Sequence, residues 1–131
     1  MDDMSPKPVP DFDRSACAAA ATLDIVGDKW SLLVIRDLLR GKSTYGELIE
    51  SPEGIPTNIL AERLRRLEDN GLVEKKPYQE RPVRFAYSLT AKGKDMGEVL
   101  LALVHWGRKH IAGTQNFAIA QGQTRRRSSG K

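Results

Sequence analysis

The chain has 131 residues, of which 40% are hydrophobic and 29% charged, so it is long enough for one domain with one core and small enough to gain from dimerisation. No apolar run approaches the ~20 residues of a membrane-spanning helix, and the acidic N-terminus lacks the charged, apolar and small residues, in that order, of a signal peptide. Its one cysteine, Cys17, excludes an internal disulfide, and we expect a cytoplasmic protein.

The net charge of +4 is carried by the C-terminal end. Six of the 21 lysines and arginines follow residue 107, whereas all 17 acidic residues precede residue 99, so residues 1–107 have a net charge of −2. Affinity of the folded domain for nucleic acid would therefore have to come from a local group of arginines. The candidates are Arg63, Arg65, Arg66, Arg81 and Arg84.

Two helices are expected in the first third of the chain, after a flexible arm of residues 1–13. The first begins at Asp13 or Ser15 and runs through Val26, and Gly27 interrupts it. The second, residues 30–39, is apolar on nearly every side, which is typical of a buried helix. Trp30 is predicted to anchor the core close to a partner subunit.

Cys17 is the one candidate for chemistry. It lies near the start of the first helix, where backbone amides and the positive end of the helix dipole favour a thiolate. The alternative is a buried, unreactive thiol, because four alanines follow it on a helix that is expected to be packed. Without a second cysteine, a switch would need a Cys17–Cys17 bond between subunits, a small thiol or an alkylating electrophile.

A capping box opens the central motif. Thr44 can accept a hydrogen bond from the amide of Glu47 while Glu47 reaches back, which predicts a short helix that carries Leu48 and Ile49. Residues 51–54, Ser-Pro-Glu-Gly, then end it, because proline lacks the amide donor and glycine accepts positive φ.

A second helix over residues 56–70 has two different faces. Leu60, Leu64 and Leu67 recur at helical spacing and must face a core. Small, hydrogen-bonding and charged side chains on the other face suit a helix in the major groove. These are Thr57, Asn58, Ala61, Glu62 and Arg65. Gly71 is predicted to supply the left-handed C-terminal cap.

Residues 72–78 and 83–89 have the aromatic, β-branched and alternating pattern of strands, with a tip at residues 79–82. Arg81 and Arg84 lie where such a wing would meet phosphates or the minor groove. A helix, a short turn, a basic helix and a hairpin follow in the order of a winged helix-turn-helix. We therefore predict a mainly α domain with a small β-hairpin wing, an α+β fold, over residues 14–113.

The arginines of the second helix also have a simpler interpretation, in which they lie on a solvated face among Glu62, Glu68 and Asp69. For Arg66, with Glu62 four residues before it and Asp69 three residues after it, an intrahelical ion pair is the favoured role.

The last helix is predicted from Thr90 to Ala112. Its apolar stripe is formed by Met96, Leu100, Leu103, Gly107 and Ile111, and it is widened by Val99, Val104 and Trp106. One small domain would not cover so broad an apolar face, so we expect it to pack on a second surface, the same helix of a symmetry mate. The expected dimer contacts are Trp30, Met96, Val99, Leu100, Leu103 and Trp106. Residues 114–131 are predicted to be a disordered basic tail, which either clings to DNA or solubilises the chain.

Other chemistry finds little support in the sequence. His105 and His110 have no carboxylate or cysteine nearby, so we expect no metal site. Phosphate loops, dinucleotide fingerprints and nucleophile elbows are not found, so we expect neither an enzyme nor a cofactor.

Several runs of residues resemble those of a known family. Residues 22–38 (TLDIVGDKWSLLVIRDL), 45–48 (YGEL), 64–73 (LRRLEDNGLV) and 87–90 (YSLT) closely resemble the HxlR family of bacterial transcriptional regulators, relatives of the MarR group, and the likeness covers residues 14–110. The resemblance implies a homodimeric repressor or activator, dimerised through its N- and C-terminal helices, with the second helix of the motif in the major groove. Some members sense oxidants or electrophiles through a cysteine at the place of Cys17.

We therefore expect a homodimer on double-stranded DNA with a palindromic operator, because recognition helices related by a two-fold axis lie about 34 Å apart. Two alternatives stay open. The same surface could bind a protein, or a small-molecule effector could lie in a pocket between Trp30, the last helix and the partner subunit.

Overall fold

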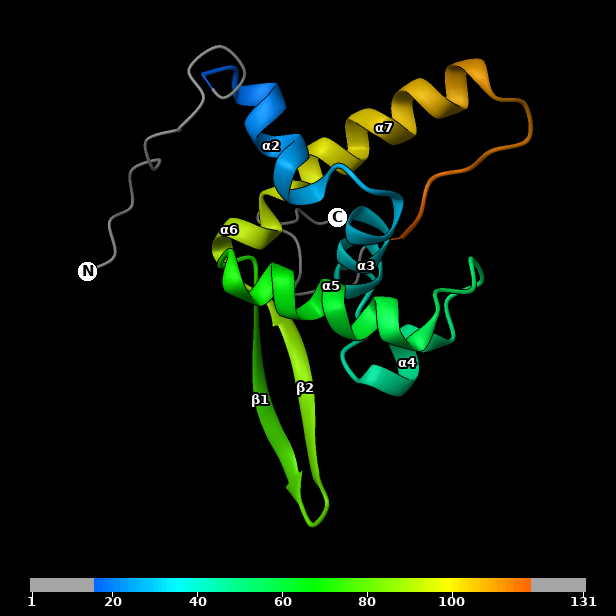
Figure 1. The fold of residues 1–131 in the computed structure, drawn as a ribbon. Helices are drawn as coiled ribbons and strands as arrows, with labels where there is room; N and C mark the ends of the chain where they lie inside the picture. Colours follow the sequence, from blue (N-terminus) through cyan, green and yellow to red (C-terminus); the bar gives the residue numbers. More distant parts are fainter. Residues whose placement is uncertain (1–15, 119–131) are drawn as a thin grey trace, which may run out of the picture.

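The computed structural model describes residues 16–118, so the predicted N-terminal arm lies outside the described residues. Two helices and a short helix lead into the central motif (Figure 1): α2 (Ala18–Val26), α3 (Lys29–Leu39) and α4 (Tyr45–Ile49). The second helix of the predicted motif and the hairpin follow as α5 (Thr57–Asp69), β1 (Val73–Glu80) and β2 (Val83–Leu89). The described chain closes with α6 (Ala91–Lys94) and α7 (Met96–His110). Between residues 16 and 118 no helix is long and apolar enough to cross a membrane.

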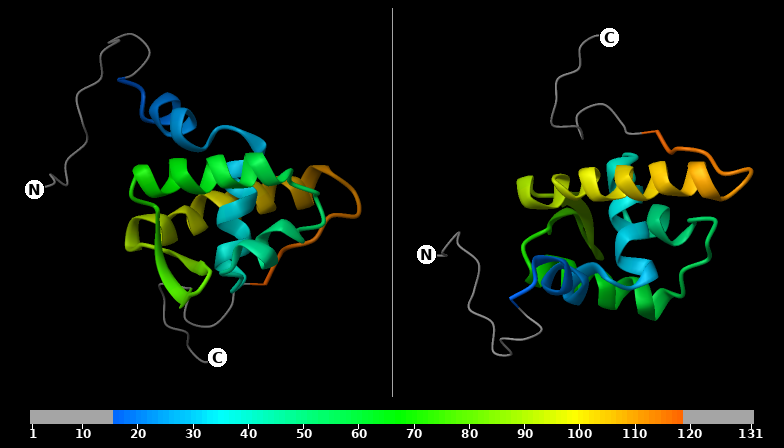
Figure 2. Two further views of the ribbon diagram at one scale, coloured as in Figure 1. Left: turned by 60° about the horizontal axis from the view of Figure 1, so that its bottom comes forward. Right: turned by 90° about the horizontal axis from the view of Figure 1, so that it is seen from above.

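Helix α3 passes through the middle of the domain, with α5 and α7 lying across it (Figure 2). Ile35, Leu38 and Leu39 on α3 are almost completely buried. From α5 the predicted stripe of Leu60, Leu64 and Leu67 packs into the same core, which confirms the predicted helix phase. The structure is the predicted mainly helical domain with a β-hairpin.

The joint between α2 and α3 is tight. Cys17 occupies the N-cap position of α2, without a side-chain cap bond, whereas the predicted start sites Asp13 and Ser15 lie outside the described residues. Gly27 ends α2 as predicted. A residue with a side chain would not fit here, because its Cβ would lie 2.3 Å from the carbonyl oxygen of Leu23. Asp28 then caps α3, which begins at Lys29, and Trp30 is half-buried against the core.

The predicted capping box is present. Thr44 Oγ1 accepts a hydrogen bond from Glu47 N at 3.1 Å, and Glu47 Oε1 accepts from the backbone amides of Ser43 at 2.8 Å and Thr44 at 3.1 Å. These amides lower the pKa of Glu47. At the far end of α5, Gly71 has the predicted left-handed conformation, with φ of +79°.

The wing is longer than predicted. β1 continues to Glu80, so the tip is only Arg81 and Pro82 instead of residues 79–82. The strand continues because Gln79 and Glu80 pair with Arg84 and Val83, after an irregularity between Pro77 and Gln79 where proline lacks the donor of a regular ladder. The base of the wing is joined to the helices by a hydrogen bond from Tyr87 N to Ser43 O, 2.8 Å.

The predicted helix over residues 90–112 is two helices. Thr90 caps α6 by accepting from Gly93 N, and its hydroxyl donates to Gly71 O at 2.6 Å, which fixes α6 at the base of the wing. Helix α7 begins at Met96 and packs on α3 through Leu100. Only part of the predicted stripe is buried, since Leu103 and Ile111 are exposed.

The predicted tail begins with residues that lie against the domain. Thr114 Oγ1 donates to Ile111 O at 2.8 Å and Gly107 O at 3.1 Å, and Phe117 packs on the core. Residues 114–118 of the predicted tail thus contact the domain, and the remainder of the predicted tail lies outside the described residues.

Replacing Leu64 by Asp is expected to unfold the domain, because Leu64 is 2% exposed and the new charge would have no partner there. The expected cost of about 3–5 kcal/mol is a large part of the stability of a small domain. Thermal unfolding followed by circular dichroism measures it. Ala61→Asp, at an exposed position of the same helix, is the matched control and should change stability by less than about 1 kcal/mol. A folded Leu64→Asp protein would mean that α5 is turned differently.

Candidate nucleic-acid interface

The N-terminal half of α5 is open to solvent. Thr57, Asn58 and Ala61 are exposed on the face opposite the buried leucines. Tyr45 on α4 donates a hydrogen bond from Oη to Thr57 O at 2.6 Å, which fixes the start of α5 against the preceding helix. The residues predicted to face base edges therefore share one accessible surface at the end of α5 that follows the turn.

Arg65 extends from the same face one turn later and is 64% exposed. Its guanidinium lies 3.2 Å from an oxygen of Asp69 and 3.5 Å from one of Glu62. Exposed pairs of this kind contribute only about 0–1 kcal/mol. The intrahelical ion pair predicted for Arg66 is present, because Arg66 lies 3.5 Å from Glu62, whereas Asp69 pairs with Arg65.

Arg63 and Arg66 belong to the interior side of α5. Arg63 is 15% exposed, and its Nε donates to Asp28 Oδ2 at 2.8 Å. Arg66 NH1 lies 3.4 Å from the other oxygen of Asp28. A second contact joins Arg63 to Glu62. These two arginines join α5 to the start of α3, so they are less available for contact with DNA than Arg65.

Asp28 is the centre of this cluster. Oδ2 accepts from the amides of Trp30 and Ser31, both at 3.1 Å, while Oδ1 accepts from the hydroxyl of Ser31 at 2.7 Å. Partial burial by itself would raise the pKa of Asp28, but the hydrogen bonds from Arg63 and Ser31 lower it to about 2. The carboxylate is therefore ionised at neutral pH and bonded to two helices at once.

A second polar cluster holds the turn of the motif. Arg36 on α3 binds both carboxylate oxygens of Glu53 at 2.8 Å, and it also donates to Ser51 and to buried Asp37. The bond from Arg36 lowers the pKa of Glu53 to about 2. The bidentate pair fixes the segment between α4 and α5 on the central helix.

The wing carries the other predicted contacts. Arg81 and Arg84 are exposed, and neither forms an ion pair with the carboxylates of the described chain. Arg84 lines a groove of about 310 Å³ between β2 and the start of α4, together with Tyr45 and Tyr78. The unpaired guanidinium group of Arg84 at this groove is suited to phosphate oxygens, as is the exposed one of Arg81 at the tip.

The predicted dimer contacts form an uneven surface. Leu103 is 52% and Trp106 59% exposed, and Val99 is also exposed, whereas Leu100 is buried and Met96 and Trp30 are half-buried. Leu23 on α2 adds a further exposed apolar side chain. The interface prediction therefore suits the exposed residues of α7, and Leu100 contributes to the core of the single chain.

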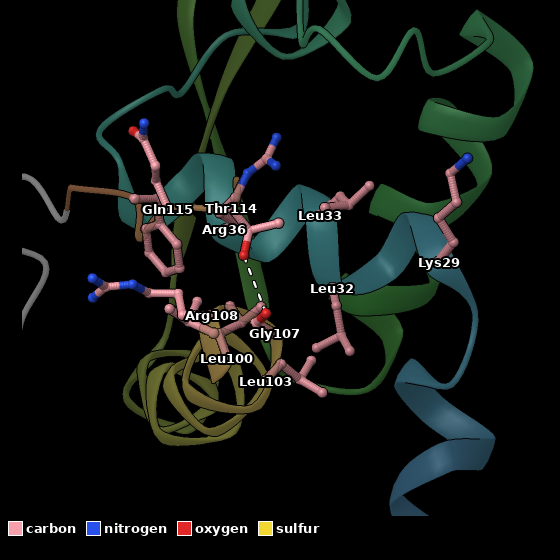
Figure 3. A pocket seen from close by; sticks show the side chains of 12 residues that line it. Lys29, Leu32, Leu33, Arg36, Leu100, Leu103, Gly107, Arg108, Thr114 and Gln115 are labelled. Atoms are coloured by element: carbon pink, nitrogen blue, oxygen red, sulfur yellow. Dashed lines mark hydrogen bonds between the residues drawn. The ribbon is translucent and has the colours of Figure 1, made fainter. Parts of the chain in front are cut away.

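A pocket of about 440 Å³ lies between α3, α7 and the segment after α7. Leu32 and Leu103 point toward one another across it, whereas the ammonium group of Lys29 points away (Figure 3). Thr114 and Phe117 close its other side. The predicted pocket lay between Trp30, the last helix and a partner subunit. The pocket of the single chain also borders the last helix, but Lys29 and Leu32 line it and Trp30 does not.

Cys17 is exposed in the single chain, at the free end of α2. The single chain therefore does not bury this thiol. Within residues 16–118 no group of three or more metal-binding side chains is found.

Asp28 and Tyr45, which hold α5 in place, were not predicted from the sequence. The Asp28–Ser31 pattern was a recognisable helix start directly after Gly27. Its bond to Arg63, 35 residues away, and the bond of Tyr45 to the backbone of Thr57 had no signal in the local pattern.

A helix held by a capped turn, with an exposed face beside a basic hairpin, defines a winged helix-turn-helix protein. More particularly, residues 25–115 match the family described as HxlR-like helix-turn-helix, and the chain belongs to this family, as its residues predicted. An uncharacterized HTH-type transcriptional regulator of Synechocystis sp. is 39% identical over 87 residues, 66% of this chain and 64% of that protein. The chain thus spans less than two thirds of that relative's length.

Solved structures agree with this family. A protein of Porphyromonas gingivalis described as a MarR-family transcriptional regulator is 30% identical, with a TM-score of 0.69 over 80% of this chain and 100% of that one. The redox regulator HypR in its reduced form is 29% identical, with a TM-score of 0.65 over 71% of this chain and 92% of that one.

Asp28→Asn is expected to lower the free energy of unfolding by about 1–3 kcal/mol near neutral pH, because Asn keeps the helix cap but loses the charged bonds to Arg63 and Arg66. The native pKa of about 2 lies below the ordinary value of 3.8. The ionised carboxylate therefore stabilises the fold above about pH 4, and this contribution is lost as the pH falls toward about 2.

Urea unfolding of both proteins across this pH range measures the difference. Glu74→Gln, which removes an exposed carboxylate at the base of the wing, controls for net charge and should show little difference at any pH. If the difference for Asp28→Asn does not change with pH, the ionic bonds of Asp28 are not its source.

Proposed function

We propose that this protein is a homodimeric, sequence-specific DNA-binding regulator of transcription, acting as a repressor in the cytoplasm, with α5 in the major groove. The observation that carries the proposal is the exposed surface of Thr57, Asn58 and Ala61 on a helix whose opposite side is fixed in the core. Asn binds adenine through two hydrogen bonds, and Thr and Ala offer methyl contacts to thymine. The surface is suited to base edges, whereas an enzyme would need a nucleophile or acid–base pair.

Arg65 is the proposed guanine contact. Its pairs with Glu62 and Asp69 are exposed and weak, so exchanging them for the O6 and N7 atoms of guanine costs little. Glu62 beside it is a proposed acceptor for a cytosine amino group and orients Arg65 in the free protein. Arg81 and Arg84 are proposed to contact the flanking phosphates or the minor groove.

The proposed dimer uses the exposed apolar residues of α7 and α2. Val99, Leu103 and Trp106 are large apolar side chains of one helix that are exposed in the single chain, and such a group suits contact with a partner. Covering it with a second copy relates the two α5 helices by a two-fold axis. The operator is then a palindrome with half-sites about 34 Å apart.

Cys17 is the proposed sensor of oxidants or electrophiles. It is exposed at the start of a helix that belongs to the proposed dimer contact, and HypR, to which this chain is similar, is a redox regulator. Modification of the thiol would change the packing of α2 and thereby the separation of the two α5 helices.

The pocket between α3 and α7 supports a second candidate signal. Its volume of about 440 Å³ and its leucine lining suit a small apolar effector. Binding there would bias the same dimer contact, because Leu103 belongs to both surfaces.

Arg65→Ala is expected to weaken binding to the cognate duplex by about 1–3 kcal/mol with little change in thermal unfolding, as for an exposed base-reading arginine. Arg84→Ala is the matched comparison, because it should weaken binding to all duplexes alike and reduce the salt dependence by about one phosphate contact. Fluorescence anisotropy at two salt concentrations measures both. Equal losses for Arg65→Ala on cognate and random DNA would reassign Arg65 to a phosphate.

Treatment with a mild oxidant or electrophile is expected to release the protein from DNA upstream of its own and neighbouring genes, and Cys17→Ser should remain bound. A titration before and after treatment tests this. Release of both proteins would exclude Cys17 as the sensor, and selective binding that ignores treatment would direct the search to effectors of the pocket. Salt-insensitive association with a protein, without selective DNA binding, would favour the alternative of a protein-binding module.

A further inference from the structure

We propose that Asp28 is a positioning residue that fixes α5 relative to α2, through its bonds to Arg63 and Arg66. What α5 reads rests on the function proposed above, whereas the positioning itself is a property of the single chain. Asp28 lies in the two-residue joint between α2 and α3, and its side chain joins the start of α3 to α5, the helix that carries Arg65.

The joint leaves little freedom at its N-terminal side. Val26, the last residue of α2, is 2% exposed in the core, and Gly27 N donates to Leu23 O at 2.8 Å. The rest of α2 lies at the edge of the domain (Figure 1), with Leu23 exposed. Val26 and the joint that follows it therefore connect α2 directly to the residue that binds α5.

The carboxylate then divides its bonds between two helices. The amides and the buried hydroxyl of Ser31 hold it at the start of α3. Arg63 Nε at 2.8 Å and Arg66 NH1 at 3.4 Å bring α5 to the same two oxygens. All of these bonds are charge-assisted, and the lowered pKa of Asp28 accords with their strength.

The arginines control how α5 is turned about its axis. Leu60, Leu64 and Leu67 fix one side by packing, which is tolerant of small rotations, whereas hydrogen bonds require a particular direction. Arg65 lies between Arg63 and Arg66 in the sequence and points to solvent. A rotation that breaks the Asp28 bonds therefore re-aims Arg65, Ala61 and Asn58 together.

The positioning is measured first inside one chain. Spin labels on Cys17 and on Ala61→Cys, both at exposed positions, report the distance between α2 and α5 when labelled chains are diluted with unlabelled protein. We expect a narrow distribution with Asp28 present, and a broader or shifted one in Asp28→Asn and in Arg63→Gln. Glu74→Gln is the control, because it removes the same negative charge as Asp28→Asn at an exposed position away from α5. If neither Asp28→Asn nor Arg63→Gln changes the distance distribution, the proposal is overturned, whether or not the protein binds DNA.

Affinity for the cognate duplex provides the second measurement. Asp28→Asn and Arg63→Gln should each weaken it by about 3- to 30-fold, and the double variant no more than the larger single loss, because both remove the same bond. Additive losses, or none, would overturn the proposal. Absence of DNA binding by the unmodified protein would instead refute the proposed function and leave the distance measurement to decide the role of Asp28.

Discussion

Helix α3 has to be covered on nearly every side, and the positions of the other elements follow from that. Ile35 is completely buried, and Leu38 and Leu39 are 1% exposed. Helix α5, helix α7 and the base of the wing each bury apolar side chains against it. Burial of one such side chain contributes about 1.5–3 kcal/mol, so the angle at which α5 crosses α3 is set by packing, before any polar contact acts on it.

The periodicity of α5 places the arginines that hold the helix in the domain on one side and an exposed arginine on another. Three arginines in four residues take different directions, because successive residues turn by about 100° around a helix. Arg63 and Arg66 bind Asp28 and join the helix to the domain, whereas Arg65 extends into solvent. Charge alone therefore does not distinguish a structural arginine from one available to a ligand. The difference lies in the exposure of the side chain and in a partner on another element: Arg63 and Arg66 reach Asp28 outside α5, whereas the exposed Arg65 pairs only within α5.

The single chain leaves part of its apolar surface uncovered. On α7, Leu100 completes the core while Leu103 and Trp106 remain in water, so one helix serves two surfaces. The pocket is lined by Leu103 of this helix, and the exposed thiol of Cys17 lies at the start of α2, which carries the exposed Leu23. In the proposed dimer, a signal at either place would act on the contact that sets the separation of the two α5 helices, and so would change the affinity for a fixed operator.

The sequence by itself determined the elements whose signals lie within a few residues. The capping box of Thr44 and Glu47, the leucine stripe of α5 and the cap at Gly71 were all predicted, because hydrogen bonds and side-chain spacing within one turn depend only on local order. Tertiary structure decided the rest. It divided residues 90–112 into α6 and α7, placed Phe117 on the core and gave Arg63 to Asp28, 35 residues away. Such contacts depend on which surfaces meet once the core forms, and periodicity carries no information about that.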